Sequence, residues 1–255
     1  MGMYEINQVS GNLPSKTDFV VVTGGEPFSV RRTLIPMLHR LNKINNNGKF
    51  SEPFTTSLQT SGYWCTSEKH VRDTLEEIFK LGVHSIIFTG YTKHHRKKGV
   101  DRDKIGSWKD SHLEQALDSL GDEIRMKIET GPVYDEKVLP FGRAKKLDKG
   151  ELRTSSMCSM SFYLGEEREI SIDPDANVYL CCWEATPTIG SAAEYPIDHL
   201  IGKAENDDIM GTLMREGLKE AAKKLGVFRP EEENIYDKNP CSICEKVFSE
   251  ADYSF

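Results

Sequence analysis

A glycine-rich turn that carries a single carboxylate is the first segment suited to binding a ligand. Residues 19–23 are β-branched or aromatic, which predicts a buried strand, and its end is followed by Gly24, Gly25, Glu26 and Pro27. Glycine has no Cβ, so the backbone of this turn can approach a ligand closely. Glu26 adds a negative charge beside free backbone N–H and C=O groups. We expect this arrangement to suit a ligand with an ammonium and a carboxylate on one carbon, which is an amino acid.

Clustered cysteines are the second set of residues that could carry out chemistry. The chain has six: Cys65, Cys158, Cys181, Cys182, Cys241 and Cys244. No secretion signal is visible, so we expect metal ligation rather than disulfides. Cys241 and Cys244 have C-x2-C spacing, with which two thiolates can hold one metal ion or two irons of one cluster. Cys65 stands apart from the others.

Alternating strands and helices must position the glycine-rich turn. Apolar runs predict strands over residues 19–23, 54–60, 84–89 and 124–130, and helical periodicity predicts helices over 29–43, 67–81 and 109–120. Repeated units of this length imply parallel strands with right-handed crossovers, whose carboxyl ends carry the ligand site. Three of these strands end at Gly24, Gly62 and Gly90. The sequence therefore predicts an α/β fold, either a barrel or an open sheet, with its site at the strand ends.

The pattern changes after Gly150. Residues 169–173 and 178–181 alternate around Pro, Asp and Asn residues, which predicts a β-hairpin. A helical stretch follows over about 207–225, and we expect its Met210 and Met214 to pack in a core rather than bind a metal. We interpret the two parts as separate domains, residues 1–150 and residues 151–255.

These motifs resemble those of radical S-adenosylmethionine (SAM) enzymes. The turn that contains Glu26 is similar to the GGEP motif of that family, and residues 139–144 are similar to a Pro-x-Gly-Arg-Ala stretch late in its barrel. The hairpin that leads into Cys181 resembles the SPASM/Twitch domain of the same family, although Ala176 stands where the family usually has glycine. The resemblance implies a partial TIM-type (β/α) barrel followed by a small α+β, cysteine-rich domain.

The resemblance also implies roles at the strand ends. The methionyl part of SAM would be held by Gly24, Gly25, Glu26 and Pro27. Its ribose or carboxylate would be reached by Thr60, Ser61 and Thr89. Arg143 either presents a guanidinium fork to a carboxylate at the cofactor site or lies in a solvated surface turn.

An auxiliary 4Fe–4S cluster is the second implied cofactor site. Its four ligands would be Cys158, Cys181, Cys241 and Cys244. Cys181 and Cys182 are adjacent and point to opposite sides of a strand, so one of them is expected to bind, and the family spacing favours Cys181. Zinc suits four thiolates as well as an iron–sulfur cluster does, so the identity of the metal stays open.

One part of the family pattern is missing from this sequence. Radical SAM enzymes hold a second 4Fe–4S cluster on a C-x3-C-x2-C loop, where SAM is cleaved to a 5′-deoxyadenosyl radical, and no such spacing occurs before Cys65. We therefore expect the chain alone to be inactive. A truncated sequence is the first explanation. Half of a split enzyme and a degenerate relative that only binds are the others.

Charge and composition narrow the partners. A net charge of −7 argues against a general nucleic-acid binder. No apolar run is long enough for a membrane helix, and we expect from the composition a cytoplasmic protein. The resemblance implies an enzyme that modifies a peptide or a small molecule, with a peptide favoured, and that takes electrons from a donor such as flavodoxin or ferredoxin. The alternative is a non-catalytic module that binds a peptide or nucleotide and holds a structural metal on its four cysteines.

Overall fold

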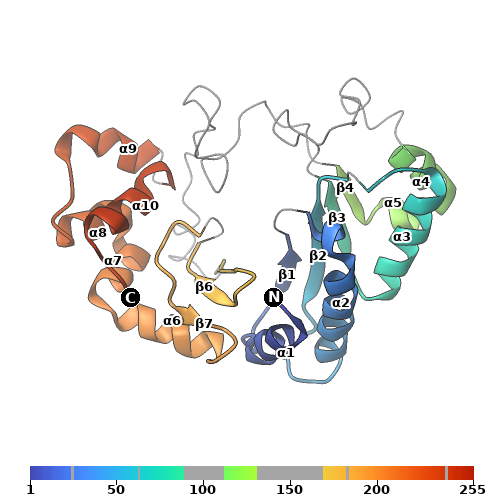
Figure 1. Ribbon diagram of the computed structural model, residues 1–255, viewed down its shortest axis with the longest axis horizontal. Coiled ribbons are helices and arrows are strands. Elements are labelled where there is room, and N and C mark those ends of the chain that lie inside the picture. The colour runs from blue at the N-terminus through green and yellow to red at the C-terminus, as the bar shows by residue number, and fades with distance from the viewer. Residues whose placement is uncertain (24–25, 63, 89–111, 131–168, 182–183, 239–240) are drawn as a thin grey trace. The chain divides into compact units, whose positions relative to one another are not determined.

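A computed structural model shows the chain in two compact units. It describes residues 1–23, 26–62, 64–88, 112–130, 169–181, 184–238 and 241–255 (Figure 1). The sheet unit comprises Ser15–Lys137, and the C-terminal unit comprises Met1–Pro14 with Val138–Phe255. The expected domain boundary at residue 150 lies outside the described residues. Within the described ranges, no helix combines the length and the apolar character needed to cross a membrane.

A parallel sheet forms the centre of the sheet unit. Its strands are β1 (Phe19–Val22), β2 (Thr55–Thr60), β3 (Ser85–Phe88) and β4 (Ile128–Thr130), in the order β1-β2-β3-β4. Each pairing is parallel, with Val21 opposite Ser57 and Ser57 opposite Ser85. The four predicted strands and the α/β class are therefore confirmed.

Helices cover one face of this sheet (Figure 1). They are α2 (Arg31–Asn45), α3 (Glu68–Lys80) and α4 (His112–Leu120). Their apolar side chains bury Leu58, Ile86 and Phe88 of the sheet. Gly82 follows α3 with a φ of 85°, the left-handed conformation common just beyond a helix end.

The opposite face of the sheet is less covered. Strand residues alternate between faces, so Phe19, Val21, Ser57, Gln59 and Ser85 share this second face. Phe19 is 54% exposed and Val21 is 38% exposed. The described helices that pack on the sheet lie on the first face only. Since parallel sheets are normally covered on both faces, this second face is suited to a further layer or to closure into a barrel.

Two local predictions in this unit are wrong. The strand expected over residues 124–130 is shorter, because Asp122–Arg125 form a helical turn, α5, whose acidic first residues suit the positive end of a helix dipole. The helix predicted over residues 29–43 would carry Val30 on its buried face, but Val30 is 56% exposed. It ends the short 3-10 helix η1 (Pro27–Val30), so it lies outside the periodicity of α2.

The C-terminal unit combines a small antiparallel sheet with helices (Figure 1). The sheet has the order β5 (Ser171–Ile172), β6 (Asn177–Tyr179) and β7 (Gly190–Ser191). The helices are α1 (Met3–Asn12), α6 (Ile197–Asn206), α7 (Asp208–Glu216), α8 (Leu218–Lys224), η7 (Pro230–Glu232), α9 (Glu233–Lys238) and α10 (Cys241–Glu250). The predicted hairpin is confirmed by the antiparallel pairing of β5 with β6.

Packing in this unit joins segments far apart in the sequence. Val9 and Leu13 of the N-terminal segment pack against its core, and Asn12 donates a hydrogen bond to the Ala192 carbonyl at 2.8 Å. Met210 and Met214 are buried in that core, as predicted. The helical stretch expected over 207–225 is two helices, because Gly217 adopts a φ of 91° between α7 and α8.

The hairpin turn is built around Asp173. Its carboxylate accepts hydrogen bonds from the N–H groups of Asp175 at 2.8 Å and Asn177 at 2.9 Å, and from the Tyr179 hydroxyl at 3.2 Å. Ala176 has a φ of 66°, the left-handed conformation that favours glycine. Alanine at this position therefore adopts a backbone conformation that glycine would favour.

Two aspartates of the C-terminal unit have lowered pKa values. Burial raises the pKa of Asp173, but the hydrogen bonds of its turn outweigh burial, and the net shift is downward. Asp207 caps α7 and accepts a hydrogen bond from the Tyr253 hydroxyl at 2.7 Å; burial again opposes these bonds, and they again lower its pKa. Burial and the charge of Asp173 raise the pKa of Tyr179 to about 12.

The C-terminal unit is expected to lose stability in acid. The pKa values of Asp173 and Asp207 are lower in the folded chain than their unfolded values of about 3.9, so their contribution is present above that pH and is lost as pH falls through the folded values. Urea unfolding at pH of about 6 and about 3 measures the loss. Asp173→Asn should lose less stability on acidification than the wild type. An equal loss would contradict the role of Asp173.

Candidate functional site

The Glu26 carboxylate joins the ends of β1 and β2. It accepts hydrogen bonds from the Thr60 hydroxyl at 2.8 Å and from the Ser61 N–H and hydroxyl at 2.9 Å and 2.5 Å. It also accepts from the Phe28 N–H at 3.1 Å, which makes Glu26 the N-cap of η1. The structure therefore brings together Glu26, Thr60 and Ser61 of the predicted site, and Pro27 is buried beside them as the first residue of η1.

The Thr60 hydroxyl is oriented toward this carboxylate. A hydroxyl donates one hydrogen bond and accepts two. Thr60 accepts from the Gly62 N–H and from the Trp64 indole N–H, each at 3.1 Å, so its proton is directed to Glu26. Trp64 also stacks on Phe28, with ring centroids 4.4 Å apart. Sequence reasoning missed this aromatic pair, because its approach depends on the turn at Gly62, where φ is 75°.

Hydrogen bonds, rather than a described cation, hold the Glu26 charge. Among the described lysine and arginine side chains, none forms an ion pair with Glu26. Burial and the negative charge of Glu26 raise the pKa of the Cys65 thiol above its ordinary value. The same negative potential favours a positively charged group at the strand ends, such as the ammonium of an amino acid.

Removing the charge of Glu26 is expected to make Cys65 easier to alkylate. In Glu26→Gln the repulsive charge is gone while burial persists, so the pKa of Cys65 should fall without reaching its ordinary value. The rate of iodoacetamide labelling of the Cys65 peptide, followed by mass spectrometry against pH, checks this. Ser61→Ala is the matched control, since it removes a hydrogen bond to Glu26 but keeps the charge. Identical pH profiles for Glu26→Gln and Ser61→Ala would contradict the prediction.

The Cys181 sulfur lies in a turn that directs hydrogen-bond donors toward it. The Ala185 N–H donates to Sγ at 3.3 Å, and the Thr186 hydroxyl lies 3.8 Å from Sγ. Glu184, with a φ of 54°, takes a left-handed conformation within this turn. Cys181 is 5% exposed. Donors of this kind stabilise a thiolate, the form that binds metals, and they favour Cys181 as a ligand, whereas Cys182 lies outside the described residues.

The C-x2-C pair lies at the start of α10. Cys244 is buried in the same core as Cys181. The positive end of a helix dipole in general favours thiolates. The Cys241 side chain and the whole of Cys158 lie outside the described residues, and the residues that are described bring no three His, Cys, Asp or Glu side chains together. The two described sulfurs are buried in one core, and the four-cysteine set stays a prediction.

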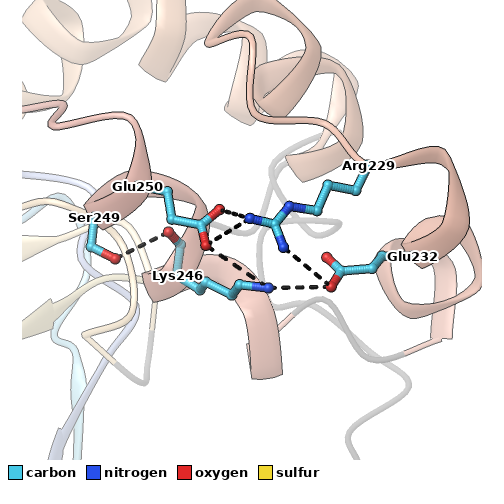
Figure 2. A network of polar contacts seen from close by, with 5 residues as sticks. All are labelled: Arg229, Glu232, Lys246, Ser249 and Glu250. Carbon is cyan, nitrogen blue, oxygen red and sulfur yellow. Dashed lines mark hydrogen bonds and ion pairs between the residues drawn. The ribbon is translucent and has the colours of Figure 1, made fainter.

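A network of ion pairs ties α10 to the segment before it (Figure 2). Arg229 Nη2 lies 3.0 Å from both carboxylate oxygens of Glu250. Lys246 Nζ lies 3.2 Å from Glu232 and 4.0 Å from Glu250, while Ser249 donates to the Lys246 carbonyl at 3.0 Å. Each half-exposed pair contributes little alone, but charges joined in a network contribute more. We infer that it steadies the helix that carries the C-x2-C pair.

Four further residues of the predicted cofactor site cannot be placed. They lie outside the described residues and are Gly24, Gly25, Thr89 and Arg143. Thr186 and Ala185, which approach Cys181, were not predicted, since no periodicity or spacing marks a donor to a sulfur. Comparison with models of protein families gives no match, and comparison with curated proteins gives none either.

Proposed function

We propose that this chain is the core of a radical SAM enzyme of the SPASM/Twitch type. It would modify a substrate, preferably a peptide, with a 5′-deoxyadenosyl radical generated from SAM. The loop with C-x3-C-x2-C spacing that cleaves SAM would have to come from a segment that this sequence does not contain, so the chain alone would be inactive. Flavodoxin or ferredoxin would supply electrons, as the family resemblance implies.

The Glu26 site carries this proposal. Its carboxylate lies at the carboxyl ends of two parallel strands, which is where parallel α/β folds bind ligands. Four hydrogen-bond donors hold the carboxylate and no described cation neutralises it, so its negative potential would favour an ammonium group nearby. Thr60 and Ser61 hold the carboxylate in place at the ends of β1 and β2. We infer that Glu26 braces the two strand ends as well as attracting the ligand.

The shape of the sheet supports the proposed partial barrel. A (β/α) barrel has helices outside and strand side chains facing inward. The sheet unit has helices packed on one face, and Ser57, Gln59 and Ser85 on the other are only half-buried. Ser57 and Ser85 hydroxyls lie 2.7 Å apart on that second face, which gives it a polar lining. An open inner face that carries these polar groups beside the apolar Phe19 and Val21 would suit a barrel that holds a substrate.

The cysteine environments support the auxiliary cluster. A 4Fe–4S cluster needs thiolate ligands in a largely buried setting, and Cys181 and Cys244 are 5% and 7% exposed in one core. When bound by four cysteines, the cluster would supply electron transfer or structural bracing. Cys158 and Cys241 would complete the set.

Iron and sulfide analysis after anaerobic purification of the chain tests the proposal. About four irons and four sulfides per chain, with broad visible absorption, are expected for one cluster. Adding a peptide with C-x3-C-x2-C spacing and measuring SAM binding by equilibrium dialysis then tests the Glu26 site. Stoichiometric zinc instead of iron would overturn the radical enzyme proposal and support the binding module with a structural metal.

A further inference from the structure

The surroundings of Cys181 carry an inference that deepens the proposed function and rests on it. We propose that Thr186 is a positioning residue for the auxiliary cluster, acting through a hydrogen bond from its hydroxyl to the Cys181 sulfur. The donor would hold the thiolate in one orientation and raise the reduction potential of the cluster.

The Thr186 hydroxyl lies within hydrogen-bond reach of the sulfur, and it would be the donor to a thiolate. Thr186 is 5% exposed, and Cys181 Sγ is the partner of its hydroxyl, at 3.8 Å. A buried hydroxyl without a partner is unfavourable, so this contact accounts for a polar group inside the core. The Ala185 N–H approaches the same sulfur at 3.3 Å. Ser171 donates to the Cys181 carbonyl at 2.7 Å, which fixes the backbone that carries the thiolate.

Two donors on one sulfur have a defined electrostatic consequence. A thiolate that binds iron carries negative charge, and reduction of the cluster adds one further electron from the reductant. Hydrogen bonds to the sulfur stabilise that added charge, and they are one of the ways in which proteins set cluster potentials. The Ala185 donor is a backbone amide, whereas the Thr186 donor is a side chain. Thr186 is therefore the donor that a substitution can remove.

Thr186→Val tests the inference, because valine keeps the branched shape and removes the hydroxyl. Thr186→Ser restores a hydroxyl. Thr212→Val is the matched control, since Thr212 is a fully buried threonine of the same unit whose hydroxyl donates to the Asp208 carbonyl, not to a sulfur. The full chain, purified anaerobically, is titrated with dithionite, and the midpoint potential is followed by electron paramagnetic resonance and visible absorption.

Thr186→Val should make the midpoint potential of the cluster more negative by ~59 mV. This shift corresponds to a tenfold change in the equilibrium constant for one-electron reduction. Thr186→Ser and Thr212→Val should stay near the wild type. If the wild type holds a cluster and Thr186→Val has the same midpoint potential, the inference is overturned and the proposed function stands. A wild-type chain that holds zinc or no metal would overturn both. Where Thr186→Val fails to fold, Thr186→Ala measured against Thr186→Ser makes the same comparison.

Discussion

Replacing Cys181 by alanine is expected to remove the proposed iron–sulfur cluster, whereas replacing its neighbour Cys182 should not. Loss of residues that merely support metal ligands weakens metal binding by about 10–100-fold, so loss of a ligand should weaken it at least as much. Cys181 is buried and accepts a hydrogen bond from the Ala185 N–H, as a ligand sulfur should. Iron and sulfide per chain, measured after anaerobic reconstitution and desalting, give the result. Equal iron in the two variants would contradict this assignment.

Two further cysteine variants sharpen this prediction. Cys244→Ala should lose iron as Cys181→Ala does, because both sulfurs lie in the same core. Cys65→Ala should keep its iron, since Cys65 packs in the core of the sheet unit. Loss of iron from Cys65→Ala at full helical content would place a cluster on a different ligand set. Circular dichroism of each variant separates loss of a ligand from loss of the fold.

Alternating apolar runs predicted the sheet unit because local and tertiary preferences agree there. Leu58, Ile86 and Phe88 are apolar residues of the predicted strands, and helices bury all three in the structure. The prediction was wrong where a local preference for a helical turn was stronger than the apolar pattern of a strand. Asp122 and Glu123 start a helical turn after Gly121, so the fourth strand begins only at Ile128. Helix and strand are hard to tell apart over such short apolar stretches.

Only part of each candidate site could be predicted from the sequence. Glu26, Thr60 and Ser61 could be grouped because parallel strands end at one edge of a sheet. Trp64 could not, since its contact with Thr60 depends on a left-handed glycine between them. Thr186 likewise follows no spacing rule, because a donor to Cys181 is chosen by the path of one turn. Such contacts are fixed by backbone geometry rather than by periodicity.

Glu26→Ala is expected to destabilise the sheet unit by about 2–4 kcal/mol, since it leaves several donors without an acceptor. The affected groups are the hydroxyls of Thr60 and Ser61 and the N–H groups of Ser61 and Phe28. Both hydroxyl-bearing residues are buried, so water replaces the lost acceptor poorly. Glu26→Gln keeps an acceptor and should lose less.

Urea unfolding followed by fluorescence and circular dichroism measures these losses. Glu76→Ala is the matched control, because Glu76 is a half-exposed partner of Lys80 in the same unit, at 3.7 Å, and such pairs contribute about 0.3–0.5 kcal/mol. A brace between two strand ends should make Glu26→Ala far more destabilising than Glu76→Ala. If the two variants unfold at the same urea concentration, Glu26 does not brace the strand ends, and its carboxylate serves the ligand alone.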